Sequence, residues 1–169
     1  DIQYRSREVI AKAHEKIDAF IKNGSEVARP LQRELRNIMW EHCGVVRSED
    51  KLQEGIKRIN KLKESLKNLD VRPDSEGFED LMLAFDLEGS IMSAEATILG
   101  AIARKESRGA HQRSDYKETN TDFDANFKIK LTDIALEVTK MNLKPLSEEL
   151  NTIVNNTKEI TNFKGLLLE

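Results

Sequence analysis

The sequence of 169 residues has one cysteine, few aromatic residues and no long hydrophobic run. The single cysteine, Cys43, excludes an internal disulfide and fits a reducing compartment. No apolar run could span a bilayer and no signal-peptide pattern opens the chain, so we expect no direct membrane insertion. Aromatic residues make up 5% and charged residues 34%, a balance that favours helices over sheets. The net charge of −3 gives no reason to expect a nucleic acid as partner.

Motifs for nucleotide binding, metal binding and nucleophilic catalysis are also missing. There is no G-x-G-x-x-G, G-x-x-x-x-G-K-[ST], C-x-x-C or H-E-x-x-H. His42 and Cys43 are neighbours, but adjacent residues on a helix point about 100° apart, and packing at a helix end is the better interpretation. We interpret Glu88 and Glu95 as boundary residues that bond to a neighbouring helix. We therefore assign no catalytic, cofactor-binding or metal-binding residue to this chain.

The sequence is organised around one long predicted helix, which runs from about residue 78 to residue 107 and ends at Gly109. This helix is apolar on nearly every side, as a buried helix is. Small residues form a strip along it: Gly89, Ser93, Ala96, Gly100 and Ala103. Because small side chains let another backbone approach closely, we expect another helix or a missing domain to cover this strip. We also expect an exposed apolar patch beside Arg104 and Arg108.

Hydrophobic periodicity predicts further helices over about residues 2–22 and 30–43, and from Ser48, as the N-cap, to Leu69. The spacing of these elements favours an antiparallel bundle with short connections. We therefore predict a mainly α fold, with a bundle of three to four helices over residues 1–113.

The composition changes after Gly109. Phe127, Ile129 and Leu131 alternate with polar residues, which is the period of a strand, and residues 136–140 could form a partner strand. A short helix is predicted from Ser147 to about residue 154. Residues 114–169 are thus expected to be an extended tail of the same domain, with a candidate β-hairpin and a short helix.

The segment that follows the long helix is rich in charge. Arg104 and Arg108 are four residues apart and would share a helical face, where cations suit the helix C-terminus. One interpretation is a solvated helix end. The other is a polar docking surface, in which guanidinium groups bind carboxylates or carbonyls of another domain. The interdomain docking candidates are Arg104, Glu106, Ser107, Arg108, His111 and Arg113.

Residues 104–116, R-K-E-S-R-G-A-H-Q-R-S-D-Y, closely resemble a signature of the succinate dehydrogenase/fumarate reductase flavoprotein family. Residues 33–40 followed by Val45-Val46-Arg47, and the spacing of Leu52, Gly55-Ile56 and Leu62, are similar to further segments of that family. The resemblance covers nearly the whole chain. Lys117 departs from it, because the family commonly has proline there, which affects only the local turn.

The resemblance implies that this chain is the C-terminal helical domain of a larger flavoprotein. The abrupt start at Asp1, inside a helical pattern, is typical of an excised domain. FAD would belong to the parent protein and not to this chain, which alone would bind no FAD and turn over no succinate. The implied partners are the FAD-binding and capping domains and an iron–sulfur subunit. The parent complex would be cytoplasmic, peripheral to the cytoplasmic face of the membrane, and would interconvert succinate and fumarate.

Two alternatives remain open. The chain resembles the same domain of L-aspartate oxidase, although the extended tail after Tyr116 argues against that branch. It could also be a stand-alone helical adaptor, although the signature argues against that. If its covering domain is absent, the isolated chain could form a homodimer through the uncovered surface.

Overall fold

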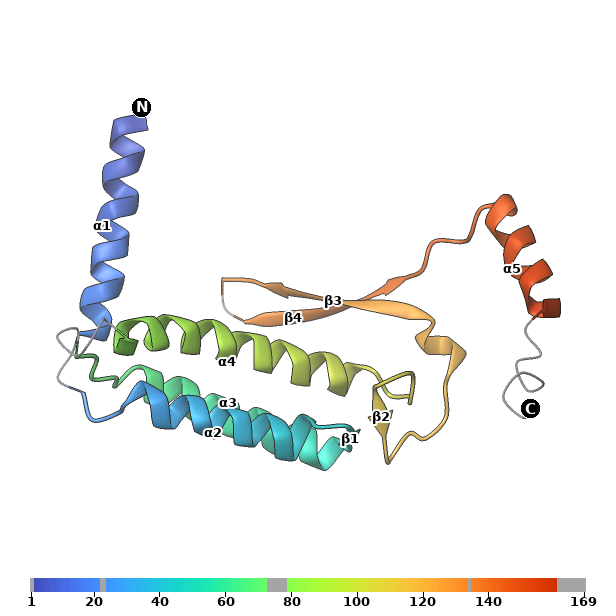
Figure 1. Ribbon diagram of the computed structural model, residues 1–169, viewed down its shortest axis with the longest axis horizontal. Coiled ribbons are helices and arrows are strands. Elements are labelled where there is room, and N and C mark those ends of the chain that lie inside the picture. Colours follow the sequence, from blue (N-terminus) through green and yellow to red (C-terminus); the bar gives the residue numbers. More distant parts are fainter. Residues whose placement is uncertain (1, 22–23, 73–78, 134, 161–169) are drawn as a thin grey trace.

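The computed structural model describes residues 2–21, 24–72, 79–133 and 135–160. It is mainly α-helical, with two small two-stranded sheets (Figure 1). The elements in chain order are α1 (Ile2–Phe20), α2 (Ala28–Cys43), β1 (Val46–Arg47), α3 (Glu49–Leu66), α4 (Glu79–Ala103), β2 (Gln112–Arg113), the short 3-10 helix η2 (Thr121–Phe123), β3 (Ala125–Leu131), β4 (Leu136–Asn142) and α5 (Glu148–Ile160).

Helices α2, α3 and α4 form the antiparallel bundle that the sequence predicts, and they hold the core (Figure 1). Each contributes one buried apolar stripe, and the stripes are Leu31, Leu35 and Ile38 on α2, Leu52, Ile59 and Leu62 on α3, and Leu87, Ile91 and Ile98 on α4. Helix α3 begins as predicted, because the Ser48 hydroxyl accepts a hydrogen bond from the Lys51 amide at 3.4 Å. The bundle is the rigid base on which the remaining elements stand.

Helix α1 does not join the bundle. It projects away from one end of it (Figure 1), and its contact with α4 is confined to its last turns. Phe20 packs edge to face on Phe85 with ring centroids 5.1 Å apart. Farther out, Val9 and Ile10 are 66% and 56% exposed, although they lie on the apolar stripe that predicted the helix. Hydrophobic periodicity thus predicted the helix but did not place it.

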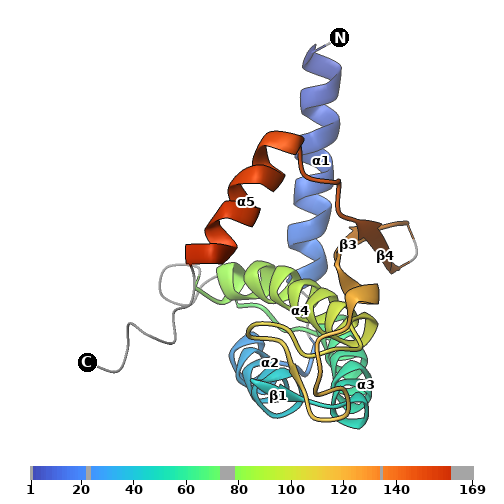
Figure 2. The same ribbon diagram turned by 90° about the vertical axis from the view of Figure 1, so that its right-hand side faces the viewer.

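The predicted hairpin is confirmed as the antiparallel pair β3–β4, with Leu131 opposite Leu136. It lies along α4 on the side away from α2 and α3, the side toward which α1 and α5 also point (Figure 2). A Cβ built on Gly100 would come within 3.2 Å of Ile129 Cδ1, so the hairpin packs closely over that part of the small-residue strip. The chain therefore covers the C-terminal half of the strip itself, while Gly89 and Ser93 remain exposed.

The short parallel pair β1–β2 was not expected from the sequence. It sets Val46 opposite Gln112 and Arg47 opposite Arg113. Because of this pairing, the charged segment after α4 lies against the connection between α2 and α3, near the start of α3. Two segments far apart in the sequence thereby meet at one end of the bundle.

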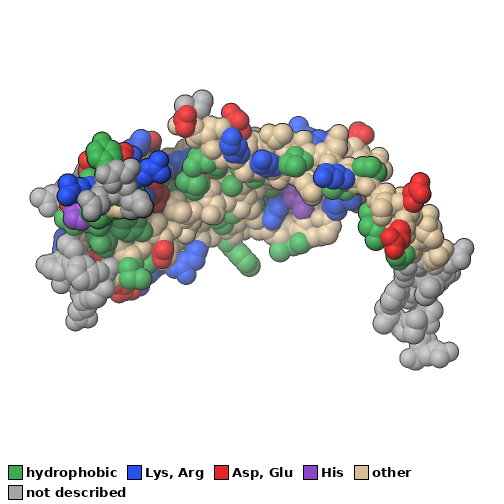
Figure 3. Space-filling view, turned by 90° about the horizontal axis from the view of Figure 1, so that it is seen from above, with side chains coloured by type: hydrophobic (Ala, Val, Ile, Leu, Met, Phe, Trp, Pro, Cys, Tyr) green, Lys and Arg blue, Asp and Glu red, His purple; other side chains and the backbone are tan. Residues whose placement is uncertain are grey.

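The C-terminal helix α5 runs to Ile160, beyond the predicted end near residue 154. The apolar chain end at residues 165–169 and most of the predicted loop at residues 72–77 lie outside the described residues. In the described part of the chain, no helix is long and apolar enough to cross a membrane. Apolar side chains are exposed at several places, between basic and acidic ones, on the side seen from above (Figure 3).

Candidate functional site

The charged segment after α4 does not continue the helix. Helix α4 ends at Ala103, four residues before the predicted end at Ser107. Arg104 and Arg108 therefore do not share a helical face, and the expectation that they do is wrong. Gly109 does not end the helix but lies in a turn, where its φ of 56° is in the left-handed region and Arg108 and His111 exchange backbone hydrogen bonds of 2.8 and 3.0 Å.

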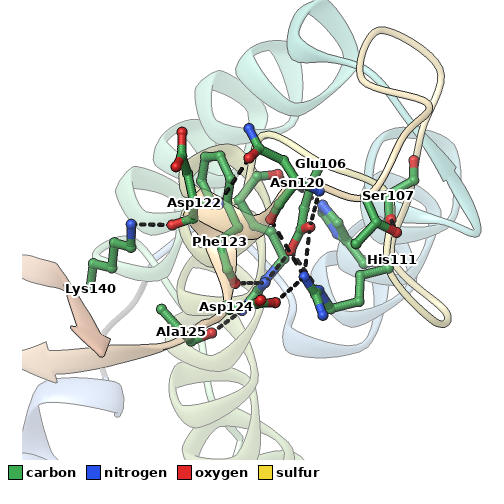
Figure 4. A network of polar contacts seen from close by, with 12 residues as sticks. Glu106, Ser107, His111, Asn120, Asp122, Phe123, Asp124, Ala125 and Lys140 are labelled. Atoms are coloured by element: carbon green, nitrogen blue, oxygen red, sulfur yellow. Dashed lines mark hydrogen bonds and ion pairs between the residues drawn. The ribbon is translucent and has the colours of Figure 1, made fainter. Parts of the chain in front are cut away.

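Glu106 explains the early end of the helix. Its side chain is fully buried, and its carboxylate accepts hydrogen bonds from Arg104 Nη1 at 2.5 Å and from Arg108 Nε at 2.9 Å (Figure 4). The backbone amide of Asn120 donates a further bond of 2.9 Å. A buried charge is stable only when it is paired and hydrogen-bonded. We infer that satisfying this carboxylate outweighs one further turn of α4.

The hydrogen bonds hold Glu106 in its charged form. Donation from Arg108, with smaller contributions from the Asn120 amide and Arg104, lowers the pKa of Glu106 from 4.5 to about 2 against the opposing effect of burial. The carboxylate is thus ionised at all ordinary pH values, and both guanidinium groups keep their anionic partner.

The two arginines also reach the start of the hairpin. Arg104 donates to the carbonyl oxygens of Phe123 at 3.0 Å and Ala125 at 2.6 Å, and its guanidinium lies 4.8 Å from the centre of the Phe127 ring. Arg108 Nη2 lies 2.5 Å from Asp124 Oδ1. The start of β3 is therefore bound to the end of α4 through Arg104, Glu106 and Arg108 (Figure 4).

Arg113 makes a second buried cluster on the other side of the segment. Its side chain is fully buried and donates from Nη1 to the Ala101 carbonyl, from Nη2 to Glu49 Oε2 (both 2.9 Å), and through Nε and Nη2 to both oxygens of Asp115 (2.8 and 2.7 Å). Hydrogen bonding from Arg113 lowers the pKa of Asp115 far below its usual range. The cluster joins the end of α4 to the first turn of α3 and to the chain after β2.

Ser107 and His111 complete the network. The Ser107 hydroxyl donates to the Tyr116 carbonyl and accepts from the Arg113 amide, both at 2.8 Å. His111 Nε2 lies 3.0 Å from the Arg104 carbonyl oxygen, so Nε2 carries the proton, and Nδ1 accepts from Arg47 Nη1 at 2.9 Å. Burial, followed by the nearby arginines, lowers the pKa of His111, which favours this neutral form.

The six docking candidates thus come together, but mainly with partners inside the chain. Glu106, Ser107 and Arg113 are buried, and of the three cationic or neutral side chains that remain, Arg108 is the most exposed, at 40%. Docking of these residues onto another domain stays a prediction. The sequence reasoning missed the acids Glu49, Asp115 and Asp124, and the only signal for them was that a buried arginine needs a carboxylate.

Other candidates behave as structural residues. Glu88 pairs with Lys16 at 2.6 Å and Glu95 with Lys63 at 2.5 Å, which confirms that both acids bond to neighbouring helices. Cys43 is buried, and burial raises the pKa of its thiol, so a reactive thiolate is disfavoured. Among the described residues, no group of three or more potential ligands could hold a metal ion.

Comparison with known proteins identifies the family. The chain matches the family described as "Fumarate reductase flavoprotein C-term" over residues 32–150, which include α2, α3, α4, the polar network and the hairpin. The chain belongs to this family. The match spans both buried arginine clusters, so they lie within the part that defines the fumarate reductase flavoprotein C-terminal domain.

Individual relatives agree with this assignment. Over 118 residues, or 69% of this chain, it is 33% identical to a fumarate reductase (CoM/CoB) of Methanothermobacter marburgensis. Over 106 residues, or 62% of the chain, it is 38% identical to the succinate dehydrogenase flavoprotein subunit of Coxiella burnetii. The structure of E. coli quinol fumarate reductase superposes with a TM-score of 0.75 at 25% identity and covers 83% of this chain.

The flavoprotein C-terminal domain is a small part of each relative. The chain spans 21% of the length of the Methanothermobacter protein, 18% of the Coxiella protein and 25% of the E. coli chain. The residues of this chain do not fit FAD themselves. Its sequence has no glycine-rich dinucleotide loop, and within the described residues the parallel strand pair β1–β2 is only two residues long.

Proposed function

We propose that this chain is the C-terminal helical domain of an FAD-dependent flavoprotein that interconverts succinate and fumarate. The domain braces the FAD-binding and capping domains of that flavoprotein and carries no catalytic residue of its own. The observation that carries the proposal is the family match over residues 32–150, joined to relatives that belong to succinate dehydrogenase and fumarate reductase.

The structure supplies a physical basis for bracing. The bundle core fixes α2, α3 and α4, and the two buried arginine clusters fix the hairpin and the segment after α4 to that core. A surface held in one arrangement loses little conformational entropy when another domain docks on it. Hydride transfer belongs to the flavin, and the protein contributes by orienting cofactor and substrate. This domain acts on that orientation through the domains it supports.

The same proposal includes the partners and the location. An iron–sulfur subunit receives electrons from the flavin of the parent protein, and the complex is peripheral to the cytoplasmic face of a membrane. The E. coli relative, whose name includes quinol as well as fumarate, supports a link to a quinone-type carrier. Separated from its parent, the chain forms a homodimer through surface that the other domains would cover.

The test is expression of the full-length flavoprotein that contains this chain. We expect bound FAD, seen in its absorption spectrum, together with fumarate-dependent oxidation of a reduced viologen dye and succinate-dependent reduction of an artificial acceptor. Oxidation of L-aspartate in place of succinate would assign the chain to L-aspartate oxidase. A full-length protein without flavin would contradict the proposal and favour an adaptor.

A further inference from the structure

The outer face of α2 carries three side chains that the bundle does not use. Arg33, Arg36 and Trp40 follow one another at spacings of three and four residues, so they lie on one face of the helix. That face is opposite the buried stripe of Leu31, Leu35 and Ile38. Trp40, the single tryptophan of the chain, is 82% exposed. We call Arg33, Arg36 and Trp40 the outer α2 face.

A groove runs beside the outer α2 face, between α2 and α4. Its volume is about 850 Å³. Core residues including Leu35, Cys43 and Ala94 form its apolar floor, while Arg36, Trp40 and Ser90 stand at its edge. Just beyond the end of α2, Val45 and Val46 are 71% and 59% exposed. Apolar surface therefore continues from the groove past Trp40 to the start of β1.

The cations of the outer α2 face have no acidic partner in the described part of the chain. Arg33 and Arg36 make no ion pair there. Other arginines of the bundle do: Arg29 pairs with Glu79, and Arg58 pairs with Glu34 at 2.6 Å and Glu41 at 3.0 Å. The chain as a whole is acidic, with a net charge of −3, so acids are available but are not placed beside this face.

Exposed tryptophan with unpaired arginine is the composition of a binding hot spot. Tryptophan and arginine are the residues that contribute most at protein interfaces, and their effect is largest in a surface pocket closed by polar residues. A guanidinium group binds a carboxylate through two parallel hydrogen bonds. The complementary surface therefore carries carboxylates set around an apolar socket for an indole ring.

We propose that the outer α2 face docks onto an acidic surface with an apolar socket on the flavin-bearing part of the same polypeptide. This inference rests on the proposed function. About four-fifths of the length of each curated relative lies outside the part that this chain spans, and the family description places the domain at the C-terminal end. A surface in the same polypeptide is present at a high effective concentration, which favours it over a separate subunit.

The direct test is hydroxyl-radical footprinting of Trp40 in the full-length, FAD-loaded flavoprotein without any other subunit. The labelling rate of Trp40 is compared with that in the same protein unfolded in urea. We expect about tenfold protection in the folded protein, as for the buried centre of an interface, and the same protection at every protein concentration.

Several outcomes overturn the docking proposal. Trp40 could label as fast as in the unfolded protein, or be protected only after an iron–sulfur subunit or anionic lipid vesicles are added. Protection that disappears on dilution would indicate a second copy instead. All three leave the proposed function standing if the protein still binds FAD and reduces fumarate. Absence of FAD and of fumarate reduction would be a failure of the proposed function itself.

Variants give an independent readout. Trp40→Ala and Arg36→Glu each weaken docking, so the connection between the domains is cleaved about tenfold faster in limited proteolysis, which follows the population of the open form. Lys57→Glu is the matched control, because Lys57 is an exposed cation on α3 with an acidic neighbour, Glu54, at 3.5 Å. Equal cleavage rates in the wild type and both outer α2 variants would refute the docking.

Discussion

Glu106→Gln tests the energetic weight of the buried network. The Glu106 carboxylate accepts four hydrogen bonds, three from Arg104 and Arg108 and one from the Asn120 amide. Glutamine has nearly the same shape but is neutral, and its amide NH2 group is one more donor in a site that contains only donors. Removing one partner from a buried charge cluster costs about 3–5 kcal/mol, because the remaining charges lose their compensation. We expect a loss in that range at pH 7.

The pH dependence supplies a second estimate of the same quantity. The folded pKa of Glu106 is about 2, against 4.5 for an ordinary glutamate, and this difference corresponds to about 3 kcal/mol. Because the folded pKa is lowered, the stabilisation is complete above pH 4.5 and is lost as the pH falls toward 2. The difference in stability between wild type and Glu106→Gln should therefore shrink over the same interval.

The assay is urea unfolding of both proteins, followed by circular dichroism at several pH values between 2 and 7. Glu64→Gln is the control, since Glu64 is 70% exposed and pairs with Lys67 on the surface at 2.7 Å. Such a pair contributes about 0.5 kcal/mol or less. A loss from Glu106→Gln no larger than that of the control, or a loss independent of pH, would refute the reasoning.

Four further substitutions follow from the structure, each measured by the same unfolding experiment. Gly109→Ala should cost about 1–2 kcal/mol, because φ at this position is 56°; Gly89→Ala should stabilise α4 by about 1 kcal/mol, because a Cβ there meets nothing within 4 Å, and equal effects of the two would contradict both. The lowered pKa of His111 means that the unfolded chain takes up the proton first, so stability should fall as the pH drops below about 6.5. His111→Gln should remove that part of the pH dependence, and an unchanged profile would show that His111 does not cause it. Arg113→Lys should cost about 2 kcal/mol or more, because lysine cannot hold both oxygens of Asp115 and the Ala101 carbonyl together; a loss below about 0.5 kcal/mol would contradict the cluster's role.

Much of the fold could be predicted from the sequence, because local periodicity determines which segments become helices or strands. The stripes of α2, α3 and α4 and the alternation in β3 are local signals of this kind. The position of α1 is not local. Its apolar residues Val9 and Ile10 predict a helix equally well whether or not another element covers them, and here they are exposed.

The polar site was predictable only in part. The charge pattern and the resemblance singled out residues 104–113, but the end of α4 at Ala103 depends on distant partners. Glu106 is satisfied by Asn120, and Arg113 by Glu49 and Asp115, through contacts that no local pattern encodes. The expected apolar patch beside Arg104 was also displaced. Ile129 of the hairpin covers Gly100, and the uncovered part of the strip lies toward Gly89.

The central claim is that this domain braces the flavin-bearing part of its parent protein. The most direct measurement is the temperature at which the full-length flavoprotein releases FAD, followed by flavin fluorescence, in the wild type, Glu106→Gln and Glu64→Gln. If the domain braces the flavin-bearing part, Glu106→Gln lowers the release temperature by several degrees and Glu64→Gln leaves it unchanged. FAD release at the same temperature in all three proteins, with the helical domain itself destabilised by Glu106→Gln, would contradict the claim.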